Sequence, residues 1–544
     1  MPLRNWMLWA CCCVELLAPR IGAGAETKRP VYPIYAIVSG QVTPTREDLE
    51  VLARNFTLAQ SRFTKEEIAT LHEINPDFKA VVYINSTYTS GPEDVPVAEG
   101  KYRKSLLYYR AATLGQDLDE KADRIALEAV NEDGSIALKP STIPGETSSG
   151  PDRPSTKFYV TWIRIGDECM RIEAFDAAKK EIQVTRGFGG TAVAAHKKSA
   201  TVLSPVYLGS SNSTGAYPGG PGRNLRYGYD PANPDGAQRC VERALEFMGE
   251  GADGLWLDIL AADPFNQADA NGGHARPWDL RTDKAYDSDA FCEGQEIKVR
   301  TIQDSVHEKL GKWPVLVANN MKAKSYAPGN GGESLLLMPT KVKPRPLDGY
   351  CIEDFVGAVS GRATKKQEAA GPTPVDEEKW RANVSMLMAA AQSRLAAYPI
   401  IADAGIQSKL IEGLGPVRDR YEQWAYCTYL LGVEKDPTTR MGLPAFYQEG
   451  ERRFAKVHPR YYWPIGAPAE TAKPENLDRY RVKGHLSYSR KFENGVVFAN
   501  PADKDDQEIT LDLEYTDPET GSKTQSVKLA AHSGKLLLKG EETK

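Results

Sequence analysis

The sequence predicts an α/β protein built on a (β/α)8 TIM-type barrel, with a small β insert and a C-terminal antiparallel β-sandwich. Three observations predict this fold. Apolar strands alternate with amphipathic helices through most of the chain, which indicates parallel strand pairing. Several of these strands end abruptly on acids or amides, as strands do at the carboxyl-end rim of a barrel. Two stretches of short alternating strands, one internal and one C-terminal, depart from the pattern.

The first part of the barrel spans residues 26–100. Strands are expected at 31–38, 56–60 and 78–85, with helices at 45–53 and 64–72 between them. Thr45 and Thr64 are suited to cap the two helices, and Glu67 completes a capping box with Thr64. The third strand ends on the amide Asn85. No G-x-G-x-x-G motif follows the first strand, so a barrel is favoured over a dinucleotide-binding sheet.

Residues 101–206 form the predicted β-rich insert, which leaves the rim after the third strand. Residues 131–157 are rich in Pro, Ser, Thr and Gly, and strands are expected at 158–165 and 181–186, around a turn at 166–167. His196 is the residue here that most resembles a catalyst. Because it stands beside two lysines, we expect a solvated turn residue instead.

The second part of the barrel spans residues 207–470, and its centre is the strand 254–258. A helix and a glycine turn precede four mostly apolar residues that end on Asp258. Strands of a parallel sheet are buried on both faces, so an acid at the carboxyl end faces the open rim. Three later strands end in the same way: one on Asn319 and Asn320, one on Glu353 and Asp354, and one on Asp403. An eighth strand is expected near 443–447.

A long polar segment, 263–289, follows Asp258. Loops of this length in a compact domain are usually functional, and its position favours a lid over the substrate that carries Trp278. After a proline-rich connector, residues 475–544 read as strand after strand, with a hairpin turn at 493–495. We expect this C-terminal sandwich to cover one side of the barrel.

Residues 1–25 resemble a secretory signal peptide, with Arg4, an apolar stretch from residue 6 to residue 17, and small residues at 23–25. The mature protein is therefore expected to be secreted or periplasmic, without a transmembrane segment. Cys11 to Cys13 leave a lipid anchor as the alternative. The net charge of −5 disfavours nucleic acid as a partner. The spacing of cysteines, histidines and acids predicts neither a disulfide framework nor a metal, and no cofactor is expected.

Residues 254–258 and 349–353, together with 488–497 and the apolar C-terminal strand, resemble the putative glycoside hydrolase-like (β/α)8-barrel families of secreted proteins. The resemblance covers most of the chain outside the insert. It implies that Asp258 is the nucleophile or stabiliser and that Glu353 is the proton donor. Because neighbouring strand residues point to opposite sides, Asp354 remains the alternative second acid.

Glycoside hydrolysis needs one protonated and one ionised carboxyl group on either side of the bond, and these two acids could supply both. Amides that donate and accept hydrogen bonds, together with aromatic rings, are suited to sugars. The predicted substrate-binding residues are Asn85, Asn319, Asn320, Asp403, Trp278 and Tyr35. Asp403 could instead cap the segment that follows it.

The sequence thus predicts a secreted glycoside hydrolase that cleaves a polysaccharide or oligosaccharide with two carboxylates. Whether it retains or inverts configuration is open. Two other functions remain: a non-catalytic glycan-binding or surface-assembly protein on a degenerate barrel, and another carbohydrate-active enzyme such as a lyase.

Overall fold

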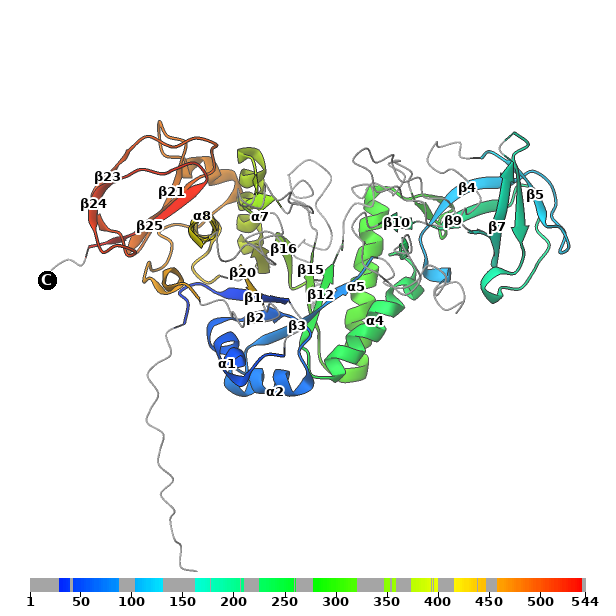
Figure 1. The fold of residues 1–544 in the computed structure, drawn as a ribbon, viewed down its shortest axis with the longest axis horizontal. Coiled ribbons are helices and arrows are strands. Elements are labelled where there is room, and N and C mark those ends of the chain that lie inside the picture. Colours follow the sequence, from blue (N-terminus) through cyan, green and yellow to red (C-terminus); the bar gives the residue numbers. More distant parts are fainter. Residues whose placement is uncertain are drawn as a thin grey trace, which may run out of the picture.

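The structure is a computed structural model, in which a barrel lies between the insert at one end and the C-terminal sheet at the other (Figure 1). The residues that it describes are 29–39, 43–87, 103–130, 162–176, 178–205, 207–209, 225–258, 260, 277–319, 347–352, 355–358, 373–392, 394, 396–399, 415–437, 439–446 and 457–540.

The barrel sheet contains eight strands, and all of its strand pairs are parallel. Across the sheet their order is β19-β16-β15-β12-β3-β2-β1-β20. The strands are β1 (Ile34–Ser39), β2 (Leu58–Gln60), β3 (Lys79–Asn85), β12 (Gly254–Asp258), β15 (Val315–Ala318), β16 (Gly349–Ile352), β19 (Ala396–Pro399) and β20 (Met441–Phe446).

The two outermost strands of this sheet come together, so the barrel is nearly closed. Arg440, the residue before β20, donates its backbone N–H to the Ala397 carbonyl of β19 at 2.8 Å. The expected TIM-like barrel is therefore confirmed in its parallel strands and in their order. The strand expected to end on Asp403 begins at Ala396 and is described as far as Pro399.

Helices cover the outside of the barrel. Within the described ranges they are α1 (Arg46–Asn55), α2 (Lys65–Ile74), α4 (Pro234–Gly249), α5 (Ser288–Leu310), α7 (Glu377–Gln392) and α8 (Gly415–Gly432). Both predicted N-caps are present. The Thr45 side chain accepts from the Asp48 N–H, and Thr64 forms the expected capping box with Glu67. These boxes satisfy N–H groups that a helix start leaves unpaired.

Side chains alternate between two packing layers along the barrel strands. The inward-facing cluster draws residues from several strands: Tyr35, Leu58, Val81, Trp256, Val317, Cys351, Ala396 and Tyr398. Tyr35 stacks on Trp256 with ring centroids 5.6 Å apart and lies over Gly442, where an added Cβ would come within 2.6 Å of the ring. The outward-facing residues join the larger cluster beneath the helices.

The insert is a small antiparallel barrel of its own. Strands β4-β5-β8-β7-β6-β9 pair in that order, and β9 pairs back with β4. Its strands are β4 (Tyr108–Leu114), β5 (Arg124–Glu128), β6 (Trp162–Ile165), β7 (Glu168–Asp176), β8 (Glu181–Thr185) and β9 (Thr201–Pro205). The expected turn at Gly166, with φ +57°, joins β6 to β7. Because β12 pairs directly with β3, the insert leaves the barrel sheet between β3 and β12.

A hairpin from the segment after Asp258 extends the insert sheet. It consists of β13 (Trp278–Asp279) and β14 (Lys284–Ala285), and Trp278 of β13 pairs with Tyr108 of β4. Two further pairs of short strands are β10 (Tyr207–Gly209) with β11 (Leu225–Tyr227), and β17 (Gly357–Ala358) with β18 (Thr373–Pro374). The insert and this hairpin, which leave the barrel at different points of the chain, therefore form one sheet.

The C-terminal strands are antiparallel, as expected, but where the structure describes them they pair into one five-stranded sheet. Its order is β21-β22-β25-β23-β24. The strands are β21 (Tyr488–Phe492), β22 (Gly495–Asn500), β23 (Ile509–Thr516), β24 (Lys523–Val527) and β25 (Ser533–Lys539). Val497 and Ala499 of β22 join the barrel's outer core, whereas Val496 and Phe498 join a separate core within the C-terminal unit. Both faces of β22 are therefore buried, one against the barrel and the other within the C-terminal unit.

Arg490 of β21 fastens this sheet to the barrel. Its guanidinium is buried and donates to the carbonyls of Leu430, Leu431 and Val433 at the carboxyl end of α8, at 2.6 to 3.2 Å. A further bond goes to the Glu470 carbonyl at 2.6 Å. The last carbonyls of a helix have no partner within the helix, so this arginine completes α8.

Candidate functional site

The candidate site is built around Asp258, the last residue of β12. Its strand lies between β3 and β15, and Asp258 is level with Asn85 across the pairing. Leu255 and Leu257 face the outer core, whereas Trp256 faces the barrel interior. Since Asp258 is two residues after Trp256, it lies on the inward face at the carboxyl end. Its side chain is half-buried.

Two side chains from neighbouring strands hold the Asp258 carboxylate. The Tyr83 hydroxyl of β3 donates to Oδ2, and the Nδ2 group of Asn319, just after β15, donates to Oδ1 at 2.8 Å. Each oxygen therefore receives a neutral donor, which stabilises the ionised form of the acid and fixes its orientation. Asn319 is 7% exposed, whereas Tyr83 is 42% exposed. An open aromatic ring thus lies directly beside an oriented carboxylate.

A second layer holds the backbone at this point. Both the N–H and the hydroxyl of Ser86, just after β3, donate to the Asp258 carbonyl, at 3.1 and 2.8 Å. The Lys298 ammonium of α5 donates to the Ser86 carbonyl at 2.9 Å. Lys298 is 0% exposed. Burial lowers its pKa to about 8, partly offset by Cys240 and Asp230 nearby.

Three predicted binding residues have other partners in the structure. Asn85 accepts the Thr87 N–H through Oδ1 at 3.1 Å, which makes a turn at the end of β3. Trp278 lies in β13 on the insert sheet, where the Arg110 guanidinium is 5.3 Å from its ring centroid. Their contact with substrate stays a prediction. Tyr35 requires a correction, because it is fully buried in the barrel interior and has no face open to a sugar.

Four predicted site residues lie outside the described part of the chain: Asn320, Glu353, Asp354 and Asp403. The separation between Asp258 and a second acid, which would distinguish retention from inversion, therefore stays a prediction.

Sequence reasoning missed Tyr83, Ser86 and Lys298. Tyr83 stands two residues before Asn85 in β3, so strand alternation already placed both on one face. Lys298 follows Phe291 and Gln295 and precedes Ile302 at helical spacing, which puts a charge on the buried side of α5. A lysine on the buried side of a helix was the sequence signal that could have identified Lys298. Ser86 had no signal of its own.

His196 also requires a correction, because its side chain is largely buried in the insert and pairs there with a buried acid, instead of lying in solvent. Its side chain is 9% exposed, and Nε2 lies 2.9 Å from Oε2 of Glu168, which is 0% exposed. Arg186 donates Nε and Nη2 to the two Glu168 oxygens at 2.7 Å each. Burial alone would raise the pKa of Glu168, but hydrogen bonds from Arg186, His196 and the Ala194 N–H outweigh it and lower that pKa.

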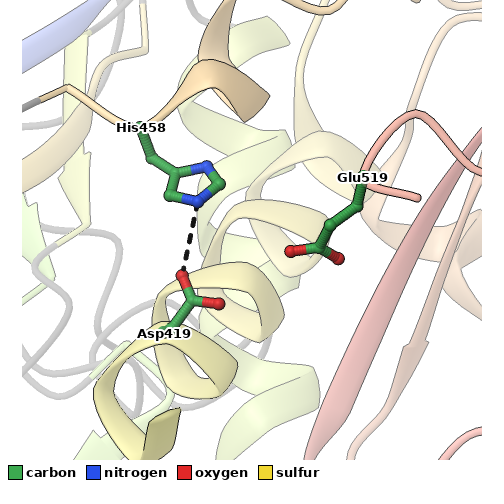
Figure 2. A group of neighbouring side chains, drawn as sticks. All are labelled: Asp419, His458 and Glu519. Atoms are coloured by element: carbon green, nitrogen blue, oxygen red, sulfur yellow. Dashed lines mark ion pairs between the residues drawn. The ribbon is translucent and has the colours of Figure 1, made fainter. Parts of the chain in front are cut away.

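A trio of possible metal ligands lies elsewhere, between the barrel and the C-terminal sheet. Figure 2 shows Asp419 of α8, His458 just before the short helix η5 (Pro459–Tyr462), and Glu519 between β23 and β24. Their ligand atoms lie within 4.8 Å of one another. The Arg460 guanidinium already occupies this place, since Nη2 contacts Asp419 and lies 3.1 Å from His458 Nε2. A metal bound to His458 Nε2 would lie against the positive charge of Arg460. The trio is therefore part of the contact between the barrel and the C-terminal sheet.

The fold and site together define a barrel protein with one oriented carboxylate at its carboxyl-end rim. No family model and no curated protein matches the chain. No described helix combines the length and apolar character needed to cross a membrane.

The solved structures that are similar to it include the following three. The glycoside hydrolase domain of PelA from Pseudomonas aeruginosa is 11% identical, with a TM-score of 0.35 over 76% of this chain and 96% of that one. The GH31 dextranase FjDex31A of Flavobacterium johnsoniae is 8% identical, with a TM-score of 0.41 over 94% and 52%. Eubacterium rectale Amy13B is 8% identical, with a TM-score of 0.40 over 94% and 97%. Such distant likeness carries no argument about catalysis, so the function is argued from the site.

Proposed function

We propose that this protein is a glycoside hydrolase that cleaves a polysaccharide or oligosaccharide, with Asp258 as its ionised carboxylate. The observation that carries the proposal is the arrangement at the rim: Asp258 accepts from Tyr83 and Asn319 beside an open aromatic ring. An ionised acid held in one orientation is suited to attack an anomeric carbon or to activate water beside it. The exposed ring of Tyr83 offers a surface on which a sugar face can pack.

The second acid in this proposal is Glu353, with Asp354 as the alternative. Strand β16 supports that choice, because Cys351 faces the barrel interior while Tyr350 and Ile352 face the outer core. A residue two positions after Cys351 shares its face in an extended strand. Glu353 would protonate the leaving oxygen while Asp258 acts at the anomeric carbon, so that water is finally divided between the two products.

The test is hydrolysis of a panel of neutral and acidic glycans by the purified protein and by Asp258→Asn. This substitution keeps the shape and removes the charge. We expect turnover to fall by several orders of magnitude while glycan affinity and folding persist, because the lost interaction matters chiefly in the transition state. Glu377→Gln, on α7 at the outside of the barrel, is the matched control and should leave turnover unchanged.

Other outcomes would replace the proposal. Glycan binding without turnover in the wild-type protein would make the barrel a binding module. A product with a new carbon–carbon double bond would make it a lyase, for which the Tyr83 phenol beside Asp258 offers a proton-transferring group. Turnover that survives Asp258→Asn would place the catalytic acid elsewhere, with Asp403 the next residue to substitute.

We also propose that the protein is exported and that its signal peptide is cleaved after residue 25. The basis is the sequence pattern of residues 1–25. N-terminal sequencing of the protein from the periplasm or medium tests this proposal. An intact N-terminus, or a lipid on Cys11, Cys12 or Cys13, would contradict it.

A further inference from the structure

A buried cation lies behind the candidate site, on the helix that packs beneath it. Lys298 of α5 is fully buried and makes no ion pair within 4.0 Å among the described residues. Its recorded hydrogen bond goes to the Ser86 carbonyl at 2.9 Å. Burying an ammonium group costs free energy unless the group is hydrogen-bonded. The contact between Lys298 and Ser86 therefore indicates a role for this lysine.

The Ser86 carbonyl is one step from the candidate catalytic residue. Ser86 donates both its N–H and its hydroxyl to the Asp258 carbonyl, at 3.1 and 2.8 Å. Tyr83, three residues earlier on the same strand, bonds the Asp258 carboxylate itself. The end of β3 therefore holds both the backbone and the side chain of Asp258, and Lys298 holds the end of β3.

We propose that Lys298 is a positioning residue, which acts through Ser86 to set the orientation of Asp258 and Tyr83. This inference rests on the proposed hydrolase function. Lys298 touches no substrate in this scheme, because its side chain lies wholly inside the protein. Its effect is geometric: a carboxylate displaced by a fraction of an ångström loses alignment with the anomeric carbon, which lowers the rate of the chemical step.

The charge of Lys298 adds a pH dependence. The groups that face it are Cys240 of α4, Asp230 before α4, and the carbonyl of Ser86. Asp230 is itself buried and accepts from Tyr286 at 2.6 Å and from the Ala232 N–H at 3.0 Å. Burial raises the pKa of Asp230 and lowers that of Lys298 to about 8. Above that pH Lys298 is a neutral amine, so its hydrogen bond to the Ser86 carbonyl is weaker.

The first experiment compares Lys298→Met, Ser86→Ala and the control Lys309→Met, which removes an exposed lysine from the same helix. For Lys298→Met we expect kcat to fall about 10- to 100-fold with KM nearly unchanged. Ser86→Ala should show the same pattern, smaller because its N–H bond remains. The wild-type kcat should decline above about pH 8, and Lys298→Met should lack this limb.

Hydrogen exchange gives a readout that does not depend on turnover. In Lys298→Met, protection should fall in peptides that cover 79–87 and 254–258, while α1 and the C-terminal sheet keep theirs. Unchanged protection there, uniform loss over the chain, or an unchanged kcat in an active enzyme would overturn the proposal. If Lys298→Met does not fold, Ser86→Ala decides by the same criteria. A wild-type protein that hydrolyses no glycan would refute the hydrolase function, and exchange alone would then decide whether Lys298 holds the end of β3.

Discussion

Removing one negative charge from the core of the insert should destabilise that unit selectively. The change is Glu168→Gln, which keeps the size of the side chain. In the native insert the Glu168 carboxylate receives two Arg186 bonds at 2.7 Å, and backbone N–H bonds from Ala194 and Gly187 at 3.1 and 3.2 Å. His196 lies 2.9 Å away. An amide can keep some of these bonds, but it leaves the buried guanidinium without a counter-charge.

Breaking a buried ion pair from one side costs about 3–5 kcal/mol. A domain of this size is stable by only about 5–15 kcal/mol, so the insert should become the least stable part of the chain. The control is Glu173→Gln on the same strand, where the carboxylate is exposed and pairs with Arg171 at 3.8 Å. Its removal should cost less than about 1 kcal/mol.

Denaturant-dependent hydrogen exchange, followed peptide by peptide, measures the insert separately from the barrel, which a single global transition would not. Acid gives a second measure. The pKa of Glu168 in the folded insert is below its ordinary value of 4.5. As the pH falls below 4.5, the unfolded state therefore binds more protons than the folded state, and the free energy of unfolding decreases until the pH is below the folded pKa. Glu168→Gln should lack that loss. An insert as stable in Glu168→Gln as in the wild type would refute the reasoning.

Three further predictions concern the site, the buried lysine and the C-terminal contact. Tyr83→Phe removes one bond to the Asp258 carboxylate, worth about 1.5–3 kcal/mol for a charged acceptor, and should lower kcat about 10- to 100-fold in the glycan assay. The folded pKa of Lys298 is about 8 against an ordinary 10.5, so the unfolded state binds more protons between these values and stability should rise with pH there. Thermal melts should show the rise in Lys309→Met but not in Lys298→Met. Arg490→Met leaves four carbonyls without their donor and should expose the C-terminal sheet to limited proteolysis at a lower denaturant concentration than wild type, whereas Lys491→Met on the exposed side of that strand should not.

Much of the barrel could be predicted from the sequence because local signals agreed with the fold. The predicted cap at Thr45 and the predicted capping box at Thr64 marked the starts of two helices, and the apolar strand before Asp258 marked the acid at the rim. Local patterns could not show that the insert closes on itself, because closure depends on a pairing between β4 and β9, about ninety residues apart. The hairpin β13–β14 joins the insert by the same kind of distant pairing.

The candidate site was predicted only in part. Asp258 was found because a charge ended an apolar run, and Asn319 because it followed the next strand. Tyr35 was misassigned because the sequence does not show whether an aromatic residue in a strand faces a bound sugar or the core. His196 was misassigned because its partner, Glu168, lies 28 residues away, and two neighbouring lysines suggested solvent. Burial is a property of the assembled fold, and neighbours in sequence do not fix it.

The double-sided burial of β22 has a consequence for how such a chain can be recombined. A terminal unit joined by a proline-rich connector would ordinarily be a candidate for transfer between proteins. Here removal of residues after 475 would uncover the apolar face of α8 and leave its last carbonyls without Arg490, so a shortened chain should be prone to aggregation. The excised piece would likewise expose Val497 and Ala499. We therefore expect a graft of the C-terminal sheet onto another protein to succeed only if α8 moves with the sheet.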